Sequence, residues 1–452
     1  MTKEKTAREL SLYIHIPFCK QKCAYCDFLS FDHCGNRLQK EYVDALIKEI
    51  SVYQSVSADY IVKTIFIGGG TPSYIDSEWI VNILDTVRNV FCVDEDAEIT
   101  IEGNPDSLTR QHLADYKKAG INRISIGLQS ANAKSLQCLQ RVHNYDQFVA
   151  AFQNARQEGF ANINVDIMSA LPGETMEDYI RTLAKVVEMN PEHISAYSLI
   201  VEENTPLSEN QELLNLLPSE ELDRQMYSRT KTLLKNSGYQ RYEISNYSKL
   251  GMECRHNIVY WTGGEYLGVG LGASSYLKVY LSDMECKEVR FHGVEQMEEY
   301  IGRFSKCDGM MEDDYTNLYH EMEEDSMYEM EDLFNMGMYE EDAFSPAEQH
   351  LREYRKLEDN PMLEFIRDYY KDLYFLKRKD RMEEMMFLGL RMMQGVSFDD
   401  FKERFSVSMQ AIYGDVLERN IQRGLLFQEN GRIFLSEKGI DVSNIVMADF
   451  ML

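Results

Sequence analysis

The sequence predicts an α/β fold, an incomplete barrel of six βα units followed by a small C-terminal α+β lobe. Short runs rich in β-branched residues alternate with longer segments in which apolar residues recur every three or four positions. The interval between two such runs has room for one helix, so the strands are predicted to be parallel. Residues 382–452 follow a different order, with three helices before a strand, a turn and a second strand.

The six predicted strands each end in glycine, proline or polar residues, and they cover residues 10–16, 64–67, 97–101, 123–128, 162–168 and 193–200. The helices predicted between them cover residues 38–54, 77–91, 108–120, 144–159 and 175–190, and two of these end at a glycine placed to cap the helix. Repeated βα units form a parallel sheet that curves as a barrel. Because the chemistry of such barrels lies at the carboxyl ends of the strands, the residues there are the candidate site.

Three domains are predicted. Residues 1–285 form the barrel with its site, residues 286–381 form a linker with an acidic, Met-rich insertion, and residues 382–452 form the C-terminal lobe. Within the linker, residues 308–342 hold fourteen acidic residues, seven methionines and no Lys or Arg. A solvated helical appendage is the preferred interpretation of this segment, and a site for a soft metal or a partner is the alternative.

The C-terminal lobe resembles a small winged-helix unit. Its helices are predicted at residues 382–393, 397–405 and 408–424, and its two strands turn at Asn430 and Gly431. Residues 399–441 carry eight acidic and six basic side chains, so the lobe lacks the basic face that DNA binding needs. A lid or a docking lobe is therefore expected.

The charge balance argues against nucleic acid as a partner. Acidic residues outnumber basic ones by 75 to 47, which gives a formal net charge of −28. Such a chain repels phosphate backbones and anionic lipid. The first residues, MTKEKTAREL, include no apolar stretch of a secretory signal, and no later run is long enough for a membrane helix. The cytoplasm is the expected location, with membrane contact only through partners.

Three closely spaced cysteines carry the strongest chemical signal. Cys19, Cys23 and Cys26 form a C-x3-C-x2-C run directly after the first predicted strand. Thiolates favour zinc or iron–sulfur centres, and a structural zinc site with His33 or Cys34 as the fourth ligand is the alternative. A cubane held by three thiolates leaves one iron open to a small molecule. At this spacing and position, the sequence resembles the radical S-adenosylmethionine (SAM) superfamily.

Polar residues end most of the later strands. The second is followed by GGGTP at residues 68–72, and Glu102, Gln129 and Asp166 end the next three. The resemblance implies that the glycine segment holds the methionyl amino group and that Arg141 pairs with the methionyl carboxylate. Asp166 is expected to accept from the ribose hydroxyls, and Ile200 is expected to line the adenine pocket. GVGLGAS at residues 268–274 lacks the acidic partner of a dinucleotide site, so close backbone packing beside the cofactor is preferred.

A closer resemblance is to the oxygen-independent coproporphyrinogen III oxidase (HemN-like) family. It rests on YIHIPFC at 13–19, GGGTPS at 68–73, EGNP at 102–105, SIGLQS at 125–130 and DIMSALPGET at 166–175, and it spans residues 12–275 and 382–452. It implies a [4Fe–4S] cluster on the three cysteines and SAM-binding residues that comprise Tyr13, Gly69, Gly70, Thr71, Glu102, Gln129, Arg141 and Asp166. In the oxidase, a 5′-deoxyadenosyl radical takes hydrogen from a propionate side chain, which loses CO2 and becomes vinyl.

Two departures favour a sister branch of that family, the haem chaperones of the HemW type. The decarboxylases carry one more cysteine where Phe28 stands here, and they have a longer extension before the cluster motif than residues 1–18. The segment HNIVYW, with His256, Asn257, Tyr260 and Trp261, resembles the chaperone branch. Histidine is a common axial haem ligand, and Tyr and Trp offer flat apolar surface. A turn with a satisfied histidine and a core Trp is the alternative.

The predicted function is therefore haem binding and transfer to haemoproteins, supported by the cluster and SAM. The implied partners are haem or a porphyrin, acceptor haemoproteins and an electron donor. A true coproporphyrinogen decarboxylase is the alternative, and a haem-degrading radical methyltransferase is a third possibility on the same scaffold.

Overall fold

The computed structural model of the chain describes residues 7–280, 286–305 and 361–452. The acidic segment 308–342 lies outside the described residues, so its predicted role as an appendage stays a prediction.

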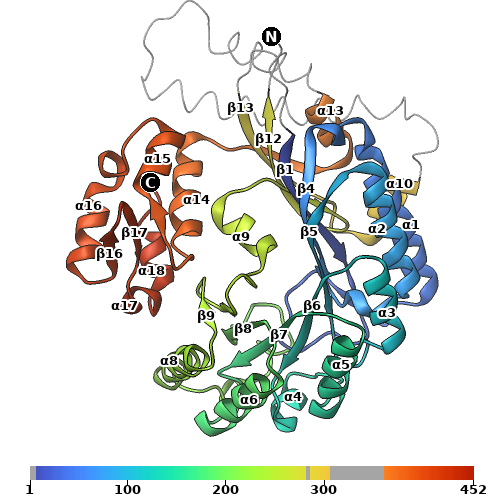
Figure 1. Cartoon of the computed structure of the whole chain (residues 1–452), viewed down its shortest axis with the longest axis horizontal. Helices are drawn as coiled ribbons and strands as arrows, with labels where there is room; N and C mark the ends of the chain where they lie inside the picture. Colours follow the sequence, from blue (N-terminus) through green and yellow to red (C-terminus); the bar gives the residue numbers. More distant parts are fainter. Residues whose placement is uncertain (1–6, 281–285, 306–360) are drawn as a thin grey trace, which may run out of the picture.

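One curved sheet of twelve strands dominates the molecule, in the order β14-β13-β12-β11-β1-β4-β5-β6-β7-β8-β10-β9 (Figure 1). The stretch from β11 to β8 is parallel, and the strands outside it pair antiparallel. The six predicted strands are confirmed as β1 (Arg8–Ile16), β4 (Tyr60–Gly69), β5 (Cys92–Gly103), β6 (Arg123–Gln129), β7 (Asn162–Ser169) and β8 (His193–Ser198). The α/β part-barrel class is thus confirmed.

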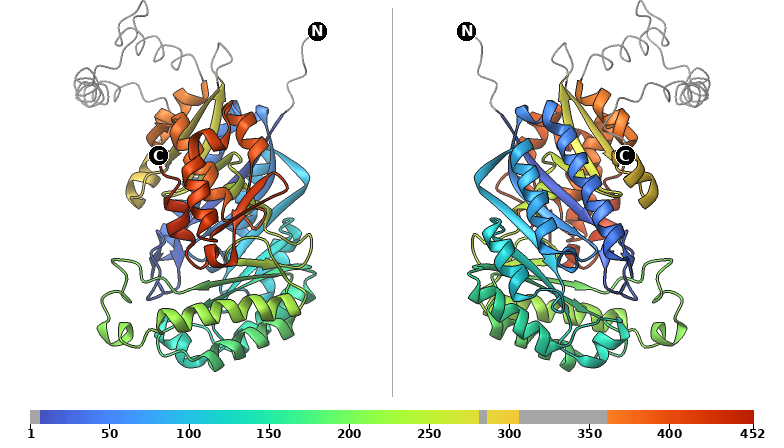
Figure 2. Two further views of the ribbon diagram at one scale, coloured as in Figure 1. Left: turned by 90° about the vertical axis from the view of Figure 1, so that its left-hand side faces the viewer. Right: turned by 90° about the vertical axis from the view of Figure 1, so that its right-hand side faces the viewer.

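Helices cover the convex face of this sheet (Figures 1 and 2). They include α1 (Asn36–Val52), α2 (Ser77–Val90), α3 (Arg110–Lys118), α4 (Ala133–Cys138), α5 (Tyr145–Gln157), α6 (Met176–Met189) and α8 (Glu220–Asn236). Polar side chains define where several of them begin; Asn144 and Thr175, for example, each form a capping box with the third helical residue. The helix periodicity in the sequence therefore predicted α1, α2, α3, α5 and α6 correctly, whereas α4 and α8 were not predicted.

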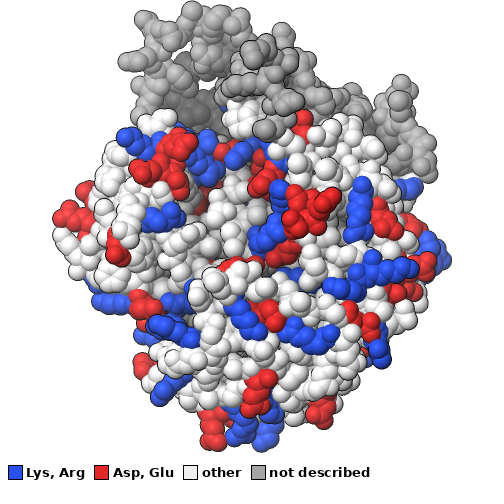
Figure 3. Space-filling model, in the orientation of Figure 1, with Lys and Arg blue, Asp and Glu red and all other residues white. Residues whose placement is uncertain are grey.

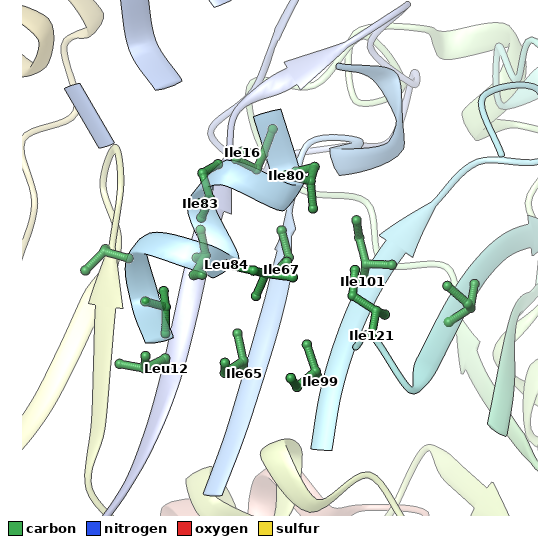
Figure 4. Packing of buried hydrophobic residues seen from close by; sticks show 14 of the residues in the cluster. Leu12, Ile16, Ile65, Ile67, Ile80, Ile83, Leu84, Ile99, Ile101 and Ile121 are labelled. Atoms are coloured by element: carbon green, nitrogen blue, oxygen red, sulfur yellow. The ribbon is translucent and has the colours of Figure 1, made fainter. Parts of the chain in front are cut away.

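Alternation along the strands divides the sheet into an apolar and a polar face. Ile65 and Ile67 of β4, with Ile99 and Ile101 of β5, are buried beside Ile80, Ile83 and Leu84 of α2 (Figure 4). The intervening residues face the inside of the barrel and are mostly polar, and they include Ser11, Thr64, Glu98, Thr100, Ser125 and Asn164. The lumen is thus lined by groups that need hydrogen-bond partners.

Parts of the segment expected to be a linker, residues 286–381, belong to the barrel sheet instead. Strands β11 (Tyr266–Val269) and β12 (Ser274–Tyr280), which lie within the predicted barrel, extend the sheet beyond β1. From the expected linker, β13 (Cys286–His292) and β14 (Lys371–Phe375) extend it further, with α10 (Met297–Ser305) and α13 (Pro361–Tyr369) beside them. Val289 and Phe291 of β13 are buried in the main core. The physical reason is that these strands bury alternate apolar residues when they pair, which the predicted boundary at residue 286 did not anticipate.

The remaining short elements connect the barrel. They are β2 (Phe18–Cys19), β3 (Phe31–Asp32), α7 (Gln211–Leu214), β9 (Gln240–Arg241), β10 (Asn246–Ser248) and α9 (Arg255–Thr262). Helix α9 lies on the concave side of the sheet, between the strands and the C-terminal lobe (Figure 1).

The C-terminal lobe has its own core and the predicted order of elements. It comprises α14 (Arg378–Gly389), β15 (Val396–Ser397), α15 (Phe398–Phe405), α16 (Met409–Gln422), β16 (Leu426–Glu429), β17 (Arg432–Leu435), α17 (Glu437–Ile440) and α18 (Ser443–Ala448). The β16–β17 turn at Asn430 and Gly431 has positive φ angles of 51° and 73°, as a tight hairpin requires.

Ion pairs join this lobe to the barrel. Glu288 of β13, which is 4% exposed, accepts from Arg404 of α15 at 3.0 Å and pairs with Arg381 of α14 at 2.6 Å. Arg290 of β13 donates to both carboxylate oxygens of Glu384, at 3.1 and 2.9 Å. A bidentate pair and a shared buried carboxylate define one orientation of the lobe on the sheet.

Acidic and basic side chains are interspersed on the face that Figure 3 shows. Among the described helices, none combines the length and apolar character needed to span a bilayer.

A buried carboxylate holds the β1 side of the sheet to its helices. Glu49 of α1 is fully buried; its Oε2 accepts from the Tyr300 hydroxyl at 2.5 Å and the Gly270 amide at 2.7 Å, and its Oε1 accepts from the Tyr370 hydroxyl at 2.7 Å. Burial raises the pKa of Glu49 to about 7, although these three hydrogen bonds oppose the rise. One side chain thereby ties α1 to the turn after β11, to α10 and to the residue after α13.

Replacement Glu49→Ala should therefore destabilise the fold. It leaves two buried hydroxyls and one buried amide without their acceptor, and we expect the free energy of unfolding to fall by roughly 2–4 kcal/mol. Urea denaturation followed by circular dichroism measures this. The control is Glu41→Ala on the same helix. The Glu41 carboxylate pairs with exposed Arg37, so its loss should change the free energy of unfolding little. Equal effects of the two substitutions would contradict the role given to Glu49.

Candidate functional site

The three cysteines lie in the loop that follows β1, at the carboxyl edge of the parallel strands. Cys19 ends β2 and is buried, whereas Cys23 and Cys26 are half-buried. The loop is held by backbone hydrogen bonds, including one from the Ala24 amide to the Leu139 carbonyl at 3.2 Å and one from the Leu207 amide to the Ala24 carbonyl at 2.8 Å. These hydrogen bonds connect the cysteine loop, residues 19–26, to the segments that follow α4 and β8.

The surroundings of these thiols suit metal-bound thiolates. The Arg141 guanidinium donates to Cys23 Sγ at 3.3 Å, and the Thr71 hydroxyl donates to Cys19 Sγ at 3.6 Å. Burial raises the pKa of Cys19, and it raises the pKa of Cys26 to about 11. Without a metal, the Cys19 and Cys26 thiols are therefore protonated at neutral pH, and a metal centre must displace their protons.

The donor set fits a cubane better than a single ion. Within the part of the chain that the structure describes, no three His, Cys, Asp or Glu side chains converge closely enough for one metal ion. In a cubane each thiolate binds a different iron, so three separated thiols around one loop are suitable ligands. Cys34, the alternative fourth ligand for zinc, donates to the Asp32 carbonyl at 3.6 Å.

Arg141 and Asn104 connect the cysteine loop with two strand ends. Arg141 Nη2 donates to Asn104 Oδ1 at 2.5 Å and to the Gly127 carbonyl at 2.6 Å. Asn104 Nδ2 in turn donates to the Thr71 hydroxyl at 3.1 Å. Asn104 was not among the predicted site residues, although its place in EGNP, two residues after Glu102, was the available signal.

Glycines let the end of β4 approach β1 and the cysteine loop. A Cβ atom on Gly69, whose φ is +110°, would lie 2.5 Å from the His15 ring, and one on Gly70 would lie 2.8 Å from the Phe18 carbonyl oxygen. The Gly70 amide donates to the Ile16 carbonyl at 2.9 Å, and the Thr71 amide donates to the Phe18 carbonyl at 2.8 Å. A side chain at either glycine would push this edge apart.

Two carboxylates face the lumen below the glycine segment. Glu102 Oε2 accepts from the Gly69 amide at 3.3 Å. Burial, and then the charge of Asp166, raises the pKa of Glu102 to about 8. Burial also raises the pKa of Asp166, against hydrogen bonds from Asn164, Ser195 and Ser125. A cationic group bound here would favour the ionised form of both side chains.

The other predicted cofactor residues are distributed along the same edge. Gln129, at the end of β6, accepts from the Tyr197 hydroxyl at 3.1 Å and has a positive φ of 67°. Half-buried Tyr13 shares a 3.0 Å hydrogen bond with His15 Nδ1. Strand β8 ends at Ser198 rather than at Ile200, and Ile200 lies in the following loop with 67% of its surface exposed. The expectation that Ile200 closes the strand is therefore wrong.

His256 lies deep in the barrel, away from the cysteine edge. It is 1% exposed, its Nδ1 is 2.8 Å from the Thr64 hydroxyl, and its Nε2 is 2.9 Å from the Tyr260 hydroxyl. Thr64 precedes the end of β4 at Gly69 by five residues, about 16 Å at the usual rise of a strand. Burial, and then the charge of Arg123, lowers the pKa of His256 to about 3.

The predicted role of His256 as an axial haem ligand does not fit this arrangement, because both ring nitrogens already have hydrogen-bond partners inside the protein. Glu98 also accepts from the Arg255 and His256 amides, each at 3.1 Å, and so caps the start of α9. The alternative of a satisfied histidine is the arrangement that the structure contains.

Tyr260 and Trp261, by contrast, line a cavity of about 110 Å³ between the barrel and the C-terminal lobe. Tyr266 and Met385 are also among its lining residues. The Arg391 guanidinium lies 4.3 Å from the centre of the Trp261 ring. Asn257 is half-buried in the first turn of α9. The HNIVYW segment therefore connects the C-terminal lobe to the barrel floor, the end of the lumen that lies away from the cysteine loop.

Comparisons with known proteins agree with these features. The radical SAM superfamily model matches residues 13–186, and the HemN C-terminal domain model matches residues 376–442. The heme chaperone HemW of Lactococcus lactis subsp. lactis is 30% identical over 98% of this chain and 97% of its own length. That of Bacillus subtilis is 30% identical over 98% of this chain and 99% of its own length.

A third relative, the heme chaperone HemW of Escherichia coli, is 40% identical over 58% of this chain and 69% of its own length. The solved coproporphyrinogen III oxidase HemN of Escherichia coli, a radical SAM enzyme, superposes with a TM-score of 0.74 at 20% identity, over 99% of this chain and 91% of that one. This likeness concerns the fold alone. The two relatives matched over nearly their whole length show that the chain belongs to the HemW family of radical SAM heme chaperones.

Proposed function

We propose that this protein binds haem and passes it to haemoproteins, with a [4Fe–4S] cluster and SAM at the carboxyl edge of its barrel. The observation that carries the proposal is the convergence of the cysteine loop, Arg141 and the GGGTP segment in a chain whose full-length relatives are named heme chaperones. Phe28, at the position of the decarboxylases' further cysteine, is 62% exposed beside that loop.

The cluster and SAM have suitable residues on this edge. Cys19, Cys23 and Cys26 would each bind one iron. The methionyl amino group would be held near Gly69, Gly70, Thr71 and Glu102, the methionyl carboxylate by Arg141, and the nucleoside by residues that comprise Tyr13, Gln129, Asp166 and Ile200. When reduced, such a cluster cleaves bound SAM to methionine and a 5′-deoxyadenosyl radical.

For haem itself, Tyr260 and Trp261 remain the proposed contacts, because they line the cavity beside the C-terminal lobe. No axial ligand is assigned, since His256 is enclosed. Acceptor haemoproteins and an electron donor for the cluster are the proposed partners.

The direct test is to supply the anaerobically reconstituted protein with haem and, separately, with coproporphyrinogen III. The proposal expects a stoichiometric Soret band with haem and no CO2 or vinyl product from the porphyrinogen. Decarboxylation without haem binding would contradict it and would support the oxidase alternative.

Cluster assembly should depend on three cysteines and not on the fourth. Cys19→Ala, Cys23→Ala and Cys26→Ala should each lose the brown chromophore and most of the bound iron, because a cubane needs all three thiolates here. Cys34→Ala is the control and should keep its iron. Iron analysis and EPR of the reduced protein measure this, and cluster loss in Cys34→Ala would show that the ligands are misassigned.

SAM affinity should rise with pH in the neutral range. The Glu102 carboxyl, with its pKa of about 8, is mostly protonated below that pH in the cofactor-free protein. The cationic amino group of SAM favours the carboxylate, so binding releases a proton and strengthens as pH rises from about 6 to about 8. Equilibrium dialysis should show this trend in the native chain and its loss in Glu102→Gln. An unchanged pH profile in the variant would contradict the assignment.

Substitution of His256 should affect stability rather than the haem spectrum. His256→Ala removes hydrogen bonds to Thr64 and Tyr260 and opens a buried cavity, so we expect a lower unfolding temperature. The Soret maximum of the haem-loaded variant, measured below that temperature, should be unchanged. A shifted Soret band with unaltered stability would restore His256 as an iron ligand.

A further inference from the structure

A chain of hydrogen bonds crosses the lumen from the barrel floor to Asp166. The Cys254 amide donates to the Tyr242 hydroxyl at 3.3 Å, and the Tyr242 oxygen lies 2.8 Å from His193 Nε2. His193 Nδ1 lies 2.6 Å from Asn164 Oδ1. Asn164 Nδ2 then donates to Asp166 Oδ1 at 2.7 Å. No sequence motif indicated His193, Asn164 or Tyr242.

Every hydrogen-bonding position of the Asn164 amide is used. Its oxygen accepts from His193 and, at 3.2 Å, from the Ser195 hydroxyl. Its nitrogen donates to Asp166 and, at 2.9 Å, to the Ser125 hydroxyl, which itself donates to Asp166 Oδ2 at 3.1 Å. A flipped amide would point its oxygen at the carboxylate, so only one orientation satisfies the network.

That orientation of the Asn164 amide determines which nitrogen of His193 carries the proton. Burial, and then the charge of Arg123, lowers the pKa of His193 well below its ordinary value, so the ring is neutral. A neutral ring has one N–H, and Asn164 Oδ1 can only accept, so the proton lies on Nδ1. Nε2 is then the acceptor for the Tyr242 hydroxyl.

We propose that His193 is a positioning residue for the nucleoside part of SAM, because it locks the Asn164 amide and, through it, the Asp166 carboxylate. This inference rests on the proposed role of Asp166 toward the ribose. A carboxylate has about four lone-pair sites, and hydrogen bonds from Asn164, Ser125 and Ser195 use three of them. The remaining site is left for a ribose hydroxyl. Binding of the nucleoside thereby depends on a histidine that does not touch it.

The first test compares SAM binding by His193→Leu and His193→Gln, using equilibrium dialysis with the cluster-loaded protein. Leu cannot donate to Asn164, which frees the amide to turn, so the Kd should rise roughly tenfold at unchanged iron content. Gln can donate to Asn164 and accept from Tyr242, so it should restore most of the affinity. In cofactor cleavage, KM should rise in His193→Leu while kcat changes little.

The second test uses Asn164→Asp, with Asn420→Asp as a matched control. Asn420 is also fully buried and donates to an aspartate, Asp449, at 2.9 Å, but it lies in the C-terminal lobe. In Asn164→Asp, two carboxylates adjoin. The other titratable groups around them are Arg123, His193, Glu102, Tyr25 and Tyr197. The variant should bind SAM weakly at pH 8 and more tightly at pH 6, when the two carboxylates share a proton.

Unchanged affinity in both His193→Leu and Asn164→Asp would overturn the proposal, as would an equal loss in Asn420→Asp. These outcomes are separable from a failure of the proposed haem function, because SAM binding is measured without haem. A native chain that loads the cluster but does not bind SAM would overturn both the role of Asp166 and that of His193.

Discussion

The alternation of side chains along the parallel strands is the constraint on which the rest of the structure depends. The parallel strands β1 and β4 to β8 place apolar residues outward under the helices and mostly polar residues in the lumen. The lumen therefore holds carboxylates, hydroxyls, amides and imidazoles that must satisfy one another in the absence of bulk water. At the carboxyl edge, the same polar lining continues into the cysteine loop, where Thr71, Asn104 and Arg141 remain close to the thiols.

The two ends of the barrel consequently have different tasks. At the carboxyl edge, glycine turns let β4 pack closely against β1 and the cysteine loop. Carboxylate lone pairs and cysteine thiols at this edge remain available to bind a cofactor. The floor is closed by α9, which Glu98 caps and which His256 ties to Thr64. The C-terminal lobe packs beside α9, and ion pairs centred on Glu288 and Glu384 hold it to β13. The HNIVYW segment is thus placed between the barrel and the lobe.

Local patterns in the sequence predicted the six parallel strands, their helices, the order of elements in the lobe and the cysteine loop. They did so because periodicity, capping residues and motif spacing are properties of neighbouring positions. Pairing of β11 with β1 and of β14 with β13 joins segments far apart in the chain, and no local pattern specified it. For the same reason, His256 looked like an accessible ligand within its motif, although its partner Thr64 comes from a distant strand. Asn104 and His193 were missed because their roles arise from contacts with other elements.

Haem transfer from this chain to an acceptor is the direct test of the proposed function. The cluster-loaded protein, first charged with haem and freed of excess, is mixed anaerobically with an apo-haemoprotein, and the Soret bands of donor and acceptor are followed after rapid separation. We expect haem to leave this chain and to appear in the acceptor faster than it does from a control, a haem-binding protein of equal affinity. Retention of haem by the chain, or transfer no faster than from that control, would contradict the proposed function.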